Sequence, residues 1–380
     1  MKRLLLSLLL VAIGTSATAQ HFFGMQKLPE HSGCAHGLEG TGIDAFSFVP
    51  PPAGFEQNGE RSVVISVTYN GFTPAAQNAF QYAVDIWASL LTSNVPILVT
   101  ANFTDLGPTT LGSAGATTGL RNFPGALQSN TFYPVALANK LHESDLAPGT
   151  PDITCSFSSS VNWYFGTDGN TPSGQYDFVT VVLHELCHGL GFFGTVQVDG
   201  SQASVGFLGS PFIYDTFVEN GAGTELASLA NPSAAVLAFA TSNDLFWNGA
   251  EGVDANDGDL PELYAPTSFS PGSSISHLNE DDFPTGSVNA LMTPFLGTAE
   301  AIHDPGAIVG GMLVDMGWEY GLQTCFGDFN DDGLVNSTDL LILLGGFGCI
   351  GVCLADLNGD SIVNATDSII FLGAFGTLCD

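Results

Sequence analysis

Apolar positions follow two different periods in the first half of the chain. After Ser62 the run VVISVTY is rich in β-branched residues, a composition typical of a strand. Thr73 and Pro74 then supply an N-cap and a first-turn proline, which predicts that a helix follows. The apolar stripe expected on that helix has helical spacing and contains Phe80, Val84, Trp87 and Leu91.

The remaining pattern predicts an α+β fold. Residues 95–103 and 152–157 are expected to be strands, the second at the edge of the sheet, and the apolar run at 178–193 a buried helix. Residues 195–275 show no dominant period apart from a short helix at 232–240, and loops this long usually carry function. The closing helix expected in GAIVGGMLVDMGWEY packs through Val309, Met312, Leu313 and Trp318.

The buried helix carries a metal-binding pattern. His184, Glu185 and His188 stand in the order His-Glu-x-x-His. On a helix the two histidines lie one turn apart on the same face, so both imidazoles can reach one zinc ion at roughly 2.0–2.1 Å. Glu185 lies about a quarter-turn away, where it can accept a proton from a metal-bound water. The pattern predicts a catalytic zinc site.

Residues beside this pattern predict the bounds of the helix. Asp177 precedes the apolar run and is expected to be the N-cap. Gly189 and Gly191 are expected to end the helix, because glycine adopts positive φ without steric cost. The chain can then turn away from the metal.

The pattern on the helix does not identify the third zinc ligand. A catalytic zinc takes three protein ligands and keeps one position for water. In the extended pattern His-Glu-x-x-His-x-x-Gly-x-x-His the third histidine would stand where this chain has Gly194. The ligand must therefore come from further along the chain, as His277, His303 or an acidic residue.

The segment HELCHGLGF at 184–192, the pair Ser276-His277 and the turn Leu-Met-Thr-Pro at 291–294 resemble the metzincin zinc endopeptidases. The spacing is similar to the leishmanolysin-like arrangement, in which a long insertion precedes the third histidine and a methionine turn lies under the metal. The resemblance covers roughly residues 62–320, and Thr293 stands where some metzincins carry a tyrosine ligand. It implies His184, His188 and His277 as zinc ligands, Glu185 as general base and Met292 as the floor of the site.

The same resemblance implies a fold and a function. The fold is a zincin-like catalytic domain of two lobes, expected at residues 61–322, in which an edge strand pairs with an extended substrate. The function is hydrolysis of peptide bonds by water activated on one zinc ion. Two alternatives stay open: a non-catalytic extracellular adhesin or scaffold subunit with a structural zinc, and a zinc hydrolase acting on other substrates.

The C-terminal part contains an internal repeat. Residues 328–339 read DFNDDGLVNSTD and residues 356–367 read DLNGDSIVNATD, and a short apolar helix is expected after each. Oxygen-bearing side chains at alternate positions suit a hard cation, so two calcium ions are expected. The ligands expected in the first copy are Asp328, Asn330, Asp332, the Leu334 carbonyl, Asn336 and Asp339. Those expected in the second copy are Asp356, Asn358, Asp360, the Ile362 carbonyl, Asn364 and Asp367.

This repeat resembles a type I dockerin over residues 325–380. The resemblance implies a small all-α domain that binds a cohesin-like partner. Ser337-Thr338 and Ala365-Thr366 fall where dockerins carry partner-contacting residues, and the two pairs differ. Position 12 of each loop is Asp instead of the Glu of an EF-hand, and Ser361 replaces the loop glycine of the second copy.

The first residues have the pattern of a signal peptide. Two basic residues precede an apolar core at 4–13 and an Ala-Thr-Ala cleavage site at 17–19. Residues 1–19 are therefore expected to be a signal peptide, and residues 20–60 an N-terminal arm or propeptide. Because no later apolar run is long enough to span a bilayer, the expected location is extracellular, without membrane insertion.

The charge of the chain narrows its partners. There are six basic and 38 acidic residues, and the net charge is −32 at pH 7. This excludes nucleic acid, which requires basic patches, and it excludes anionic membrane surfaces. Part of the acidic excess belongs to the calcium loops, and the expected partner of the catalytic domain is a peptide or protein substrate.

Seven cysteines in an exported chain predict disulfides, with one cysteine left over. Cys187 is expected on the side of the zinc helix opposite Glu185, where it could form a bridge to Cys155. Cys34 is a candidate thiolate cap for the zinc of a latent precursor. The four cysteines expected to form two bridges in the C-terminal fifth are Cys325, Cys349, Cys353 and Cys379.

Overall fold

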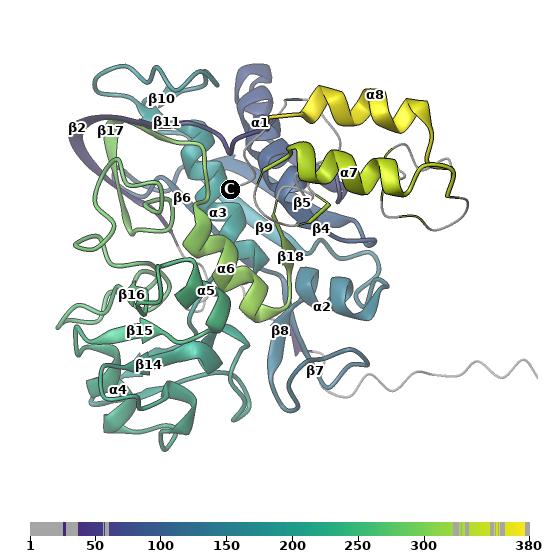
Figure 1. Cartoon of the computed structure of the whole chain (residues 1–380). Helices are drawn as coiled ribbons and strands as arrows, with labels where there is room; N and C mark the ends of the chain where they lie inside the picture. The colour runs from purple at the N-terminus through teal and green to yellow at the C-terminus, as the bar shows by residue number, and fades with distance from the viewer. Residues whose placement is uncertain are drawn as a thin grey trace, which may run out of the picture.

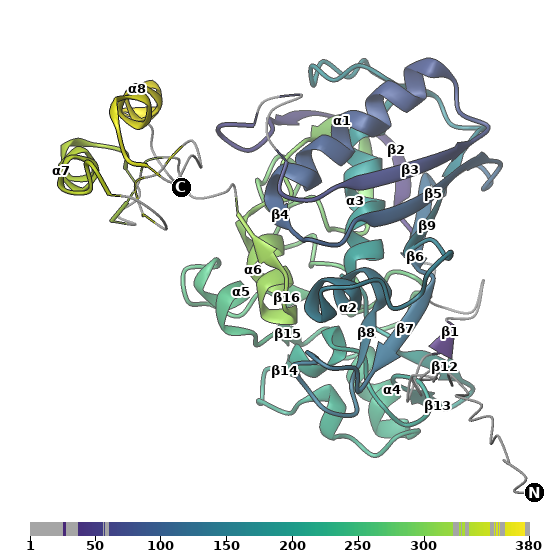
Figure 2. The same cartoon turned by 90° about the vertical axis from the view of Figure 1, so that its right-hand side faces the viewer.

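The structure is a computed structural model in which helices and strands are mixed along the chain (Figures 1 and 2), which agrees with the α+β class. No helix among the described residues is long and apolar enough to cross a membrane. The expected signal peptide at 1–19 lies outside the described residues. The residues that the structure describes are 26–27, 37–55, 57, 61–321, 327, 329–330, 334–349, 353, 355, 357 and 362–376.

A four-stranded sheet forms the first layer of the domain. Its strand order is β3-β5-β9-β6, and β6 (Gly112–Ala116) is antiparallel to the other three, which are parallel. The strand expected at 152–157 is present as β9 (Ile153–Ser158), but its expected position at the edge is wrong. It lies between β5 (Ile97–Thr104) and β6, while the edges are β6 and β3 (Ile65–Asn70).

Two helices pack on this sheet and on each other, α1 (Pro74–Leu90) and α3 (Phe178–Leu190) (Figure 2). The expected start of α1 is confirmed, because the Thr73 hydroxyl accepts a hydrogen bond from the Ala76 N–H at 3.2 Å. The indole N–H of Trp87 donates to the Leu183 carbonyl of α3 at 3.1 Å. The predicted stripe is buried in full: Phe80, Val84, Trp87 and Leu91.

Part of the N-terminal arm belongs to this domain. Strand β2 (Glu39–Val49) runs parallel to β17 (Phe295–Ile302), a strand more than 240 residues later in the chain (Figure 1). The ladder between them is interrupted twice by shifts of register. Val49 is buried, and its carbonyl accepts the N–H of His303 at 2.9 Å.

The expected closing helix is α6 (Ala307–Met316), and Val309, Met312 and Leu313 are buried in it as expected. Trp318 anchors the segment after it, since the indole N–H donates to the Leu190 carbonyl of α3 at 3.0 Å. The helix expected at 232–240 is α4 (Ala234–Ala240). The remaining elements of the insertion are β12 (Gln197–Asp199), β13 (Gln202–Ser204), η1 (Tyr214–Phe217), β14 (Val218–Asn220), η2 (Leu226–Ser228), β15 (Leu245–Trp247), α5 (Ala250–Asp254) and β16 (Glu262–Leu263).

Short elements complete the domain. One small sheet joins strand β7 to β1 and β8, and another pairs β18 with β4 in antiparallel fashion. A parallel bridge between β10 and β11 precedes α3. Their bounds are β1 (Gln26–Lys27), β4 (Leu91–Thr92), β7 (Thr118–Arg121), β8 (Phe132–Pro134), α2 (Val135–His142), β10 (Trp163–Tyr164), β11 (Tyr176–Asp177) and β18 (Glu319–Tyr320).

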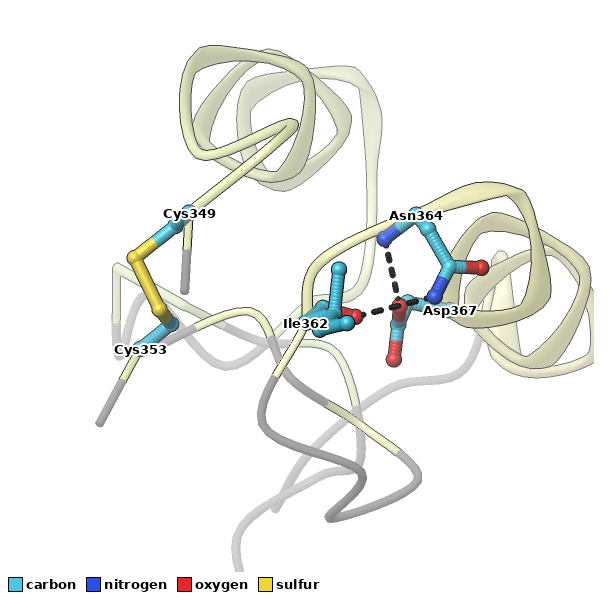
Figure 3. Close-up of a disulfide and its surroundings, with 5 residues drawn as sticks. All are labelled: Cys349, Cys353, Ile362, Asn364 and Asp367. Atoms are coloured by element: carbon cyan, nitrogen blue, oxygen red, sulfur yellow. Dashed lines mark hydrogen bonds between the residues drawn. A yellow bond between two sulfur atoms is a disulfide. The ribbon is translucent and has the colours of Figure 1, made fainter. Parts of the chain in front are cut away.

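The C-terminal repeat has its own small core. Helices α7 (Ser337–Gly345) and α8 (Ala365–Ala374) each follow one loop of the repeat, as expected. A disulfide joins Cys349 and Cys353 (Figure 3). The other two cysteines of this region, Cys325 and Cys379, lie outside the described residues. The buried core consists of Val335, Leu343, Ala355, Val363 and Phe371.

The bridge considered between Cys155 and Cys187 is absent. Both residues are buried free cysteines, on β9 and α3 respectively. Burial raises the pKa of both thiols well above the ordinary value, so both stay protonated at neutral pH. Packing of α3 on the sheet takes the place of the expected staple. Cys34, the candidate zinc cap, lies outside the described residues.

Candidate metal centre

Three histidine side chains converge in the interior of the domain. The Nε2 atom of His184 lies 3.1 Å from that of His188 and 3.2 Å from that of His277. All three residues are fully buried. Nitrogen ligands about 2.0–2.1 Å from a tetrahedral zinc ion lie roughly 3.4 Å from one another, so the spacing fits one such ion. Among the described residues, these three histidines form a group whose ligand atoms lie close enough together to hold a metal ion.

The second nitrogen of each ring contacts a backbone carbonyl. Nδ1 of His184 lies 2.7 Å from the Leu291 carbonyl oxygen. Nδ1 of His188 lies 2.6 Å from the Phe192 oxygen, and that of His277 lies 2.8 Å from the Ser273 oxygen. A carbonyl only accepts, so each Nδ1 carries the proton and donates it. The three rings are thereby fixed in the tautomer that leaves the Nε2 lone pair for a metal.

With the protons on Nδ1, the Nε2 atoms of the three rings lie close to a common point, an arrangement that could hold a metal ion. Neutral imidazole suits zinc and several other transition metals, and three nitrogens with one further position are typical of catalytic zinc.

Local sequence positions the first two histidines. The expected N-cap is confirmed, because the Asp177 carboxylate accepts the Thr180 N–H at 2.8 Å. Helix α3 ends at Leu190, and Gly191 is its C-cap with φ of 126°. Gly189 was expected to end the helix as well, but it lies inside α3. Its role is close packing, since an added Cβ would lie 2.4 Å from the Ile153 side chain.

Long-range contacts position the third histidine. The Ser276 hydroxyl accepts the Gly194 N–H at 3.0 Å, which joins the residue before His277 to the segment that follows α3. The Tyr214 hydroxyl donates to the Ile275 carbonyl at 2.7 Å. The residues just before His277 are therefore held from two sides.

A buried carboxylate braces the start of the insertion. Asp215 accepts hydrogen bonds from the Thr195 N–H at 2.9 Å, the Thr195 hydroxyl and the Phe212 N–H at 3.0 Å. Burial raises the pKa of Asp215 to about 6, although these hydrogen bonds oppose the rise. Sequence reasoning missed this residue, because a lone aspartate in a long insertion carries no recognisable pattern.

The methionine turn contacts both parts of the histidine group through its backbone. The Leu291 carbonyl binds His184, and the next carbonyl, that of Met292, accepts the Leu278 N–H at 2.8 Å. The turn closes with a hydrogen bond from the Thr293 N–H to the Ala290 carbonyl at 3.1 Å. Met292 is fully buried, so the turn supports the site from inside the protein.

His303, the other histidine considered as a ligand, lies elsewhere. Its Nε2 is 2.9 Å from the Asp177 carboxylate, at the opposite end of α3 from His188. Both side chains are fully buried. His303 thus supports the N-terminus of the metal-binding helix and is not one of the three converging histidines.

Glu185 is buried beside the histidine group. Its Oε1 accepts the backbone N–H of Leu38 at 3.1 Å, and it faces β6, where an added Cβ on Gly112 would lie 2.7 Å from its Cγ. Burial raises the pKa of Glu185 well above its ordinary value, and the hydrogen bond from Leu38 opposes the rise. A carboxyl with a raised pKa is suited to accept a proton and return it. Sequence reasoning missed both neighbours, Leu38 and Gly112.

The described part of each calcium loop forms a helix cap. Asp339 accepts the Phe329 N–H at 2.8 Å and the Asn336 N–H at 3.0 Å. In the second copy Asp367 accepts the Leu357 N–H at 2.8 Å. It also accepts the Asn364 N–H at 2.7 Å (Figure 3). The described expected ligands are Asn330, Leu334, Asn336, Asp339, Ile362, Asn364 and Asp367, and the others, Asp328, Asp332, Asp356, Asn358 and Asp360, lie outside the described residues.

The chain was compared with known protein families, curated proteins and solved structures. A family model described as SPBPB7E8-like matches residues 70–253, a range that contains His184, Glu185 and His188 but ends before His277. No curated protein and no solved structure matches the chain.

Proposed function

We propose that this chain is a secreted zinc-dependent endopeptidase of the metzincin type, with the leishmanolysin-like ligand spacing. One observation carries the proposal: three Nε2 atoms converge at 3.1–3.2 Å, each ring oriented by a backbone carbonyl, with Glu185 next to His184 in the chain. The proposal includes a catalytic domain of two lobes, one on either side of this centre. The distance of His277 along the chain matters less than the geometry, because the fold returns it to the helix.

The residues of the site divide the work of hydrolysis. Zinc held by the three histidines would supply Lewis-acid chemistry and a lower pKa for the attacking water. Glu185 accepts the proton of that water and then donates it to the leaving amine nitrogen. Because burial raises the pKa of Glu185, its carboxylate accepts the proton more readily than an ordinary glutamate would.

The substrate is an extended peptide. Strand β6 is at the edge of the four-stranded sheet and lies against α3, so a peptide that paired along it would be held through main-chain hydrogen bonds. Glu185 faces this same strand at Gly112. A peptide bond aligned along β6 would thus pass the proposed general base.

The main alternative is a non-catalytic adhesin or scaffold subunit with a structural zinc. Structural zinc has four protein ligands, whereas the metal-binding group of the described residues contains three. Glu185 also lies directly after His184 in the chain, where the general base of a catalytic zinc site is expected. These observations favour catalysis. A zinc hydrolase acting on other substrates is the second alternative, and the peptide-binding edge argues against it.

For the C-terminal repeat we propose a dockerin-like calcium-binding domain with two calcium ions and a cohesin-like partner. The support is the repeat itself: two loops with the same alternation of oxygen ligands, the same capping box and the same following helix. Asp339 and Asp367 occupy equivalent buried positions in the two copies.

Removal of the metal should abolish activity selectively. Casein cleavage by the purified protein is expected to stop with 1,10-phenanthroline and to return when zinc is added, because the three histidines provide no catalysis of their own. The isomer 1,7-phenanthroline, which cannot chelate, is the matched control. EGTA at a concentration that removes calcium but not zinc is expected to lower the melting temperature of the C-terminal repeat and leave casein cleavage intact. Cleavage that survives 1,10-phenanthroline would rule out the proposal.

A further inference from the structure

Asp215 is a buried carboxylate in the insertion between α3 and His277. It lies in η1, is 0% exposed, and accepts hydrogen bonds from two segments of the chain. The N–H and hydroxyl of Thr195 belong to the segment after α3, and the Phe212 N–H belongs to the segment before η1. Asp215 is not a member of the three-histidine group, whose ligand atoms all lie within 4.8 Å of one another. Its effect on the metal centre is therefore indirect.

The Thr195 side chain depends on Asp215 for its orientation. Its hydroxyl donates its proton to the Asp215 carboxylate and accepts the Gly206 N–H at 2.7 Å. Thr195 and Asp215 are 1% and 0% exposed, so a lost partner would leave a buried polar group unsatisfied. Asp215 thus holds Thr195, and with it the segment that follows α3, in one place.

That segment supports the turn before His277. The N–H of Gly194, the residue before Thr195, donates to the Ser276 hydroxyl at 3.0 Å. An added Cβ at Gly194 would lie 2.8 Å from the Ile275 side chain, so the two segments are in close contact. Because Ser276 directly precedes His277, a shift of Thr195 would reach the third histidine through adjacent residues.

Tyr214, the neighbour of Asp215 in η1, contacts the same turn. Its hydroxyl donates to the Ile275 carbonyl at 2.7 Å, and its ring centroid lies 5.3 Å from that of Phe192. The Phe192 carbonyl is the one that orients His188, whose Nδ1 lies 2.6 Å from it. Because the two residues are adjacent, the three hydrogen bonds that fix Asp215 also fix Tyr214.

The turn before His277 needs this support because its backbone is strained. Ile275 has φ of 71°, in the left-handed region that a β-branched residue rarely adopts. Such a conformation persists only where the surrounding contacts impose it. The Ile275 N–H donates to the Tyr264 carbonyl at 2.7 Å, and the Ile275 carbonyl accepts the Tyr214 hydroxyl. Without these contacts the turn would relax and move His277 with it.

We infer that Asp215 is a positioning residue for the metal centre. Through Thr195 and Tyr214 it holds the strained turn at Ile275, and so places the His277 imidazole where it can bind the ion. This inference rests on the three-histidine centre of the proposed function. It follows that loss of the Asp215 carboxylate weakens metal binding although every metal ligand is unchanged.

The first test replaces Asp215 with asparagine. In Asp215→Asn an amide NH2 group faces donors that the carboxylate accepts, so the contacts to Thr195 and Phe212 cannot all form. Zinc affinity is measured by competition with a chromophoric chelator. The Kd for zinc is expected to rise roughly 10–100-fold, as it does when an outer partner of a metal ligand is lost.

Asp152→Asn is the matched control. Asp152 is also buried, and burial also raises its pKa to about 6. Its carboxylate accepts the Leu98 N–H at 2.8 Å and the Asn139 amide at 2.9 Å, both away from the turn before His277. The zinc Kd of Asp152→Asn should match that of the wild type, even where the melting temperature of the metal-free protein falls.

A pair of variants at Thr195 tests the route. Thr195→Ser keeps the hydroxyl that joins Asp215 to Gly206, and its zinc Kd is expected to match that of the wild type. Thr195→Val has nearly the same shape without the hydroxyl, and its Kd should rise as in Asp215→Asn. Combining Thr195→Val with Asp215→Asn should weaken binding little beyond either change alone, because both remove the same support.

Cobalt reports on the ligand that moves. The visible spectrum of Co²⁺ depends on the number and geometry of its ligands. With cobalt in place of zinc, the spectrum of Asp215→Asn is expected to shift toward that of His277→Ala, because the same imidazole is displaced in both. A role in stability alone would lower the melting temperature of Asp215→Asn and leave its cobalt spectrum and zinc Kd unchanged.

The outcomes distinguish the role of Asp215 from the peptidase activity. An Asp215→Asn protein whose zinc Kd and cobalt spectrum equal those of Asp152→Asn would overturn the inference. A wild type that binds no zinc would overturn it together with the proposed function. If the wild type binds zinc but hydrolyses no peptide, and Asp215→Asn binds zinc more weakly, the positioning role is supported and the peptidase proposal is contradicted.

Discussion

Replacing Glu185 with glutamine is expected to lower kcat/KM for peptide hydrolysis on the order of 10²–10⁴-fold, the usual contribution of a general base. Glutamine has nearly the same shape, and its carbonyl can still accept the Leu38 N–H that Glu185 accepts. It cannot take a proton from water. The histidines are untouched, so zinc content should stay near about one ion per chain. The rates are measured with a fluorogenic peptide.

A control variant and the zinc content show how the result for Glu185→Gln is to be interpreted. Glu225→Gln removes an exposed carboxylate far along the insertion and should leave the rate unchanged. Glu185→Gln with full activity would mean that Glu185 is not the base. A loss of zinc together with the loss of activity would mean instead that Glu185 holds the site together.

Replacing His277 with alanine is expected to remove zinc. It deletes one of three nitrogen ligands, so the loss of affinity should exceed the roughly 10–100-fold caused by losing an outer partner of a ligand. The zinc content after dialysis against a weak chelator measures this. The fold should survive in part, because Ser276 and Ile275 keep their contacts with Gly194 and Tyr214.

The other histidines serve as controls for this result. His142→Ala removes a histidine of α2 that binds a backbone carbonyl outside the metal centre, and its zinc content should match the wild type. His303→Gln should also retain zinc, since the amide can still donate to Asp177. If His303→Gln lost zinc and His277→Ala kept it, His303 and not His277 would be the third zinc ligand.

The parts of the site predicted from sequence are those fixed by neighbours in the chain. The N-caps Thr73 and Asp177 could be predicted because an N-cap side chain accepts a hydrogen bond from the backbone N–H three residues later in the chain. His184 and His188 follow from one helical turn. His277 could be narrowed only to a few candidates, since the contacts that place it span 82 and 61 residues.

The edge of the sheet was predicted wrongly for a physical reason. Residues 152–157 have the β-branched composition of a strand, but such composition suits an interior strand at least as well as an edge. The true edge, β6, reads GSAGA and resembles a loop. Its first position requires a glycine because Glu185 approaches the backbone closely there, and this contact exists only in the folded chain.

The cysteines show the same limit. Cys155 and Cys187 stand on elements that do pack together, as expected, yet both remain free thiols. Sequence spacing indicates which face of a helix a cysteine occupies, but it does not give the Cα separation and Cβ direction that a disulfide requires. The contact of Leu38 with Glu185 was missed because residues 37–40 have no periodicity of their own.

The most direct test of the metal centre is X-ray absorption at the zinc edge of the purified protein, with elemental analysis of the same sample. Three imidazole nitrogens and one lighter oxygen or nitrogen ligand at roughly 2.0–2.1 Å, at about one zinc per chain, are the predicted result. Absence of stoichiometric zinc, or a shell that contains sulfur from Cys187 or another thiol, would contradict the three-histidine centre.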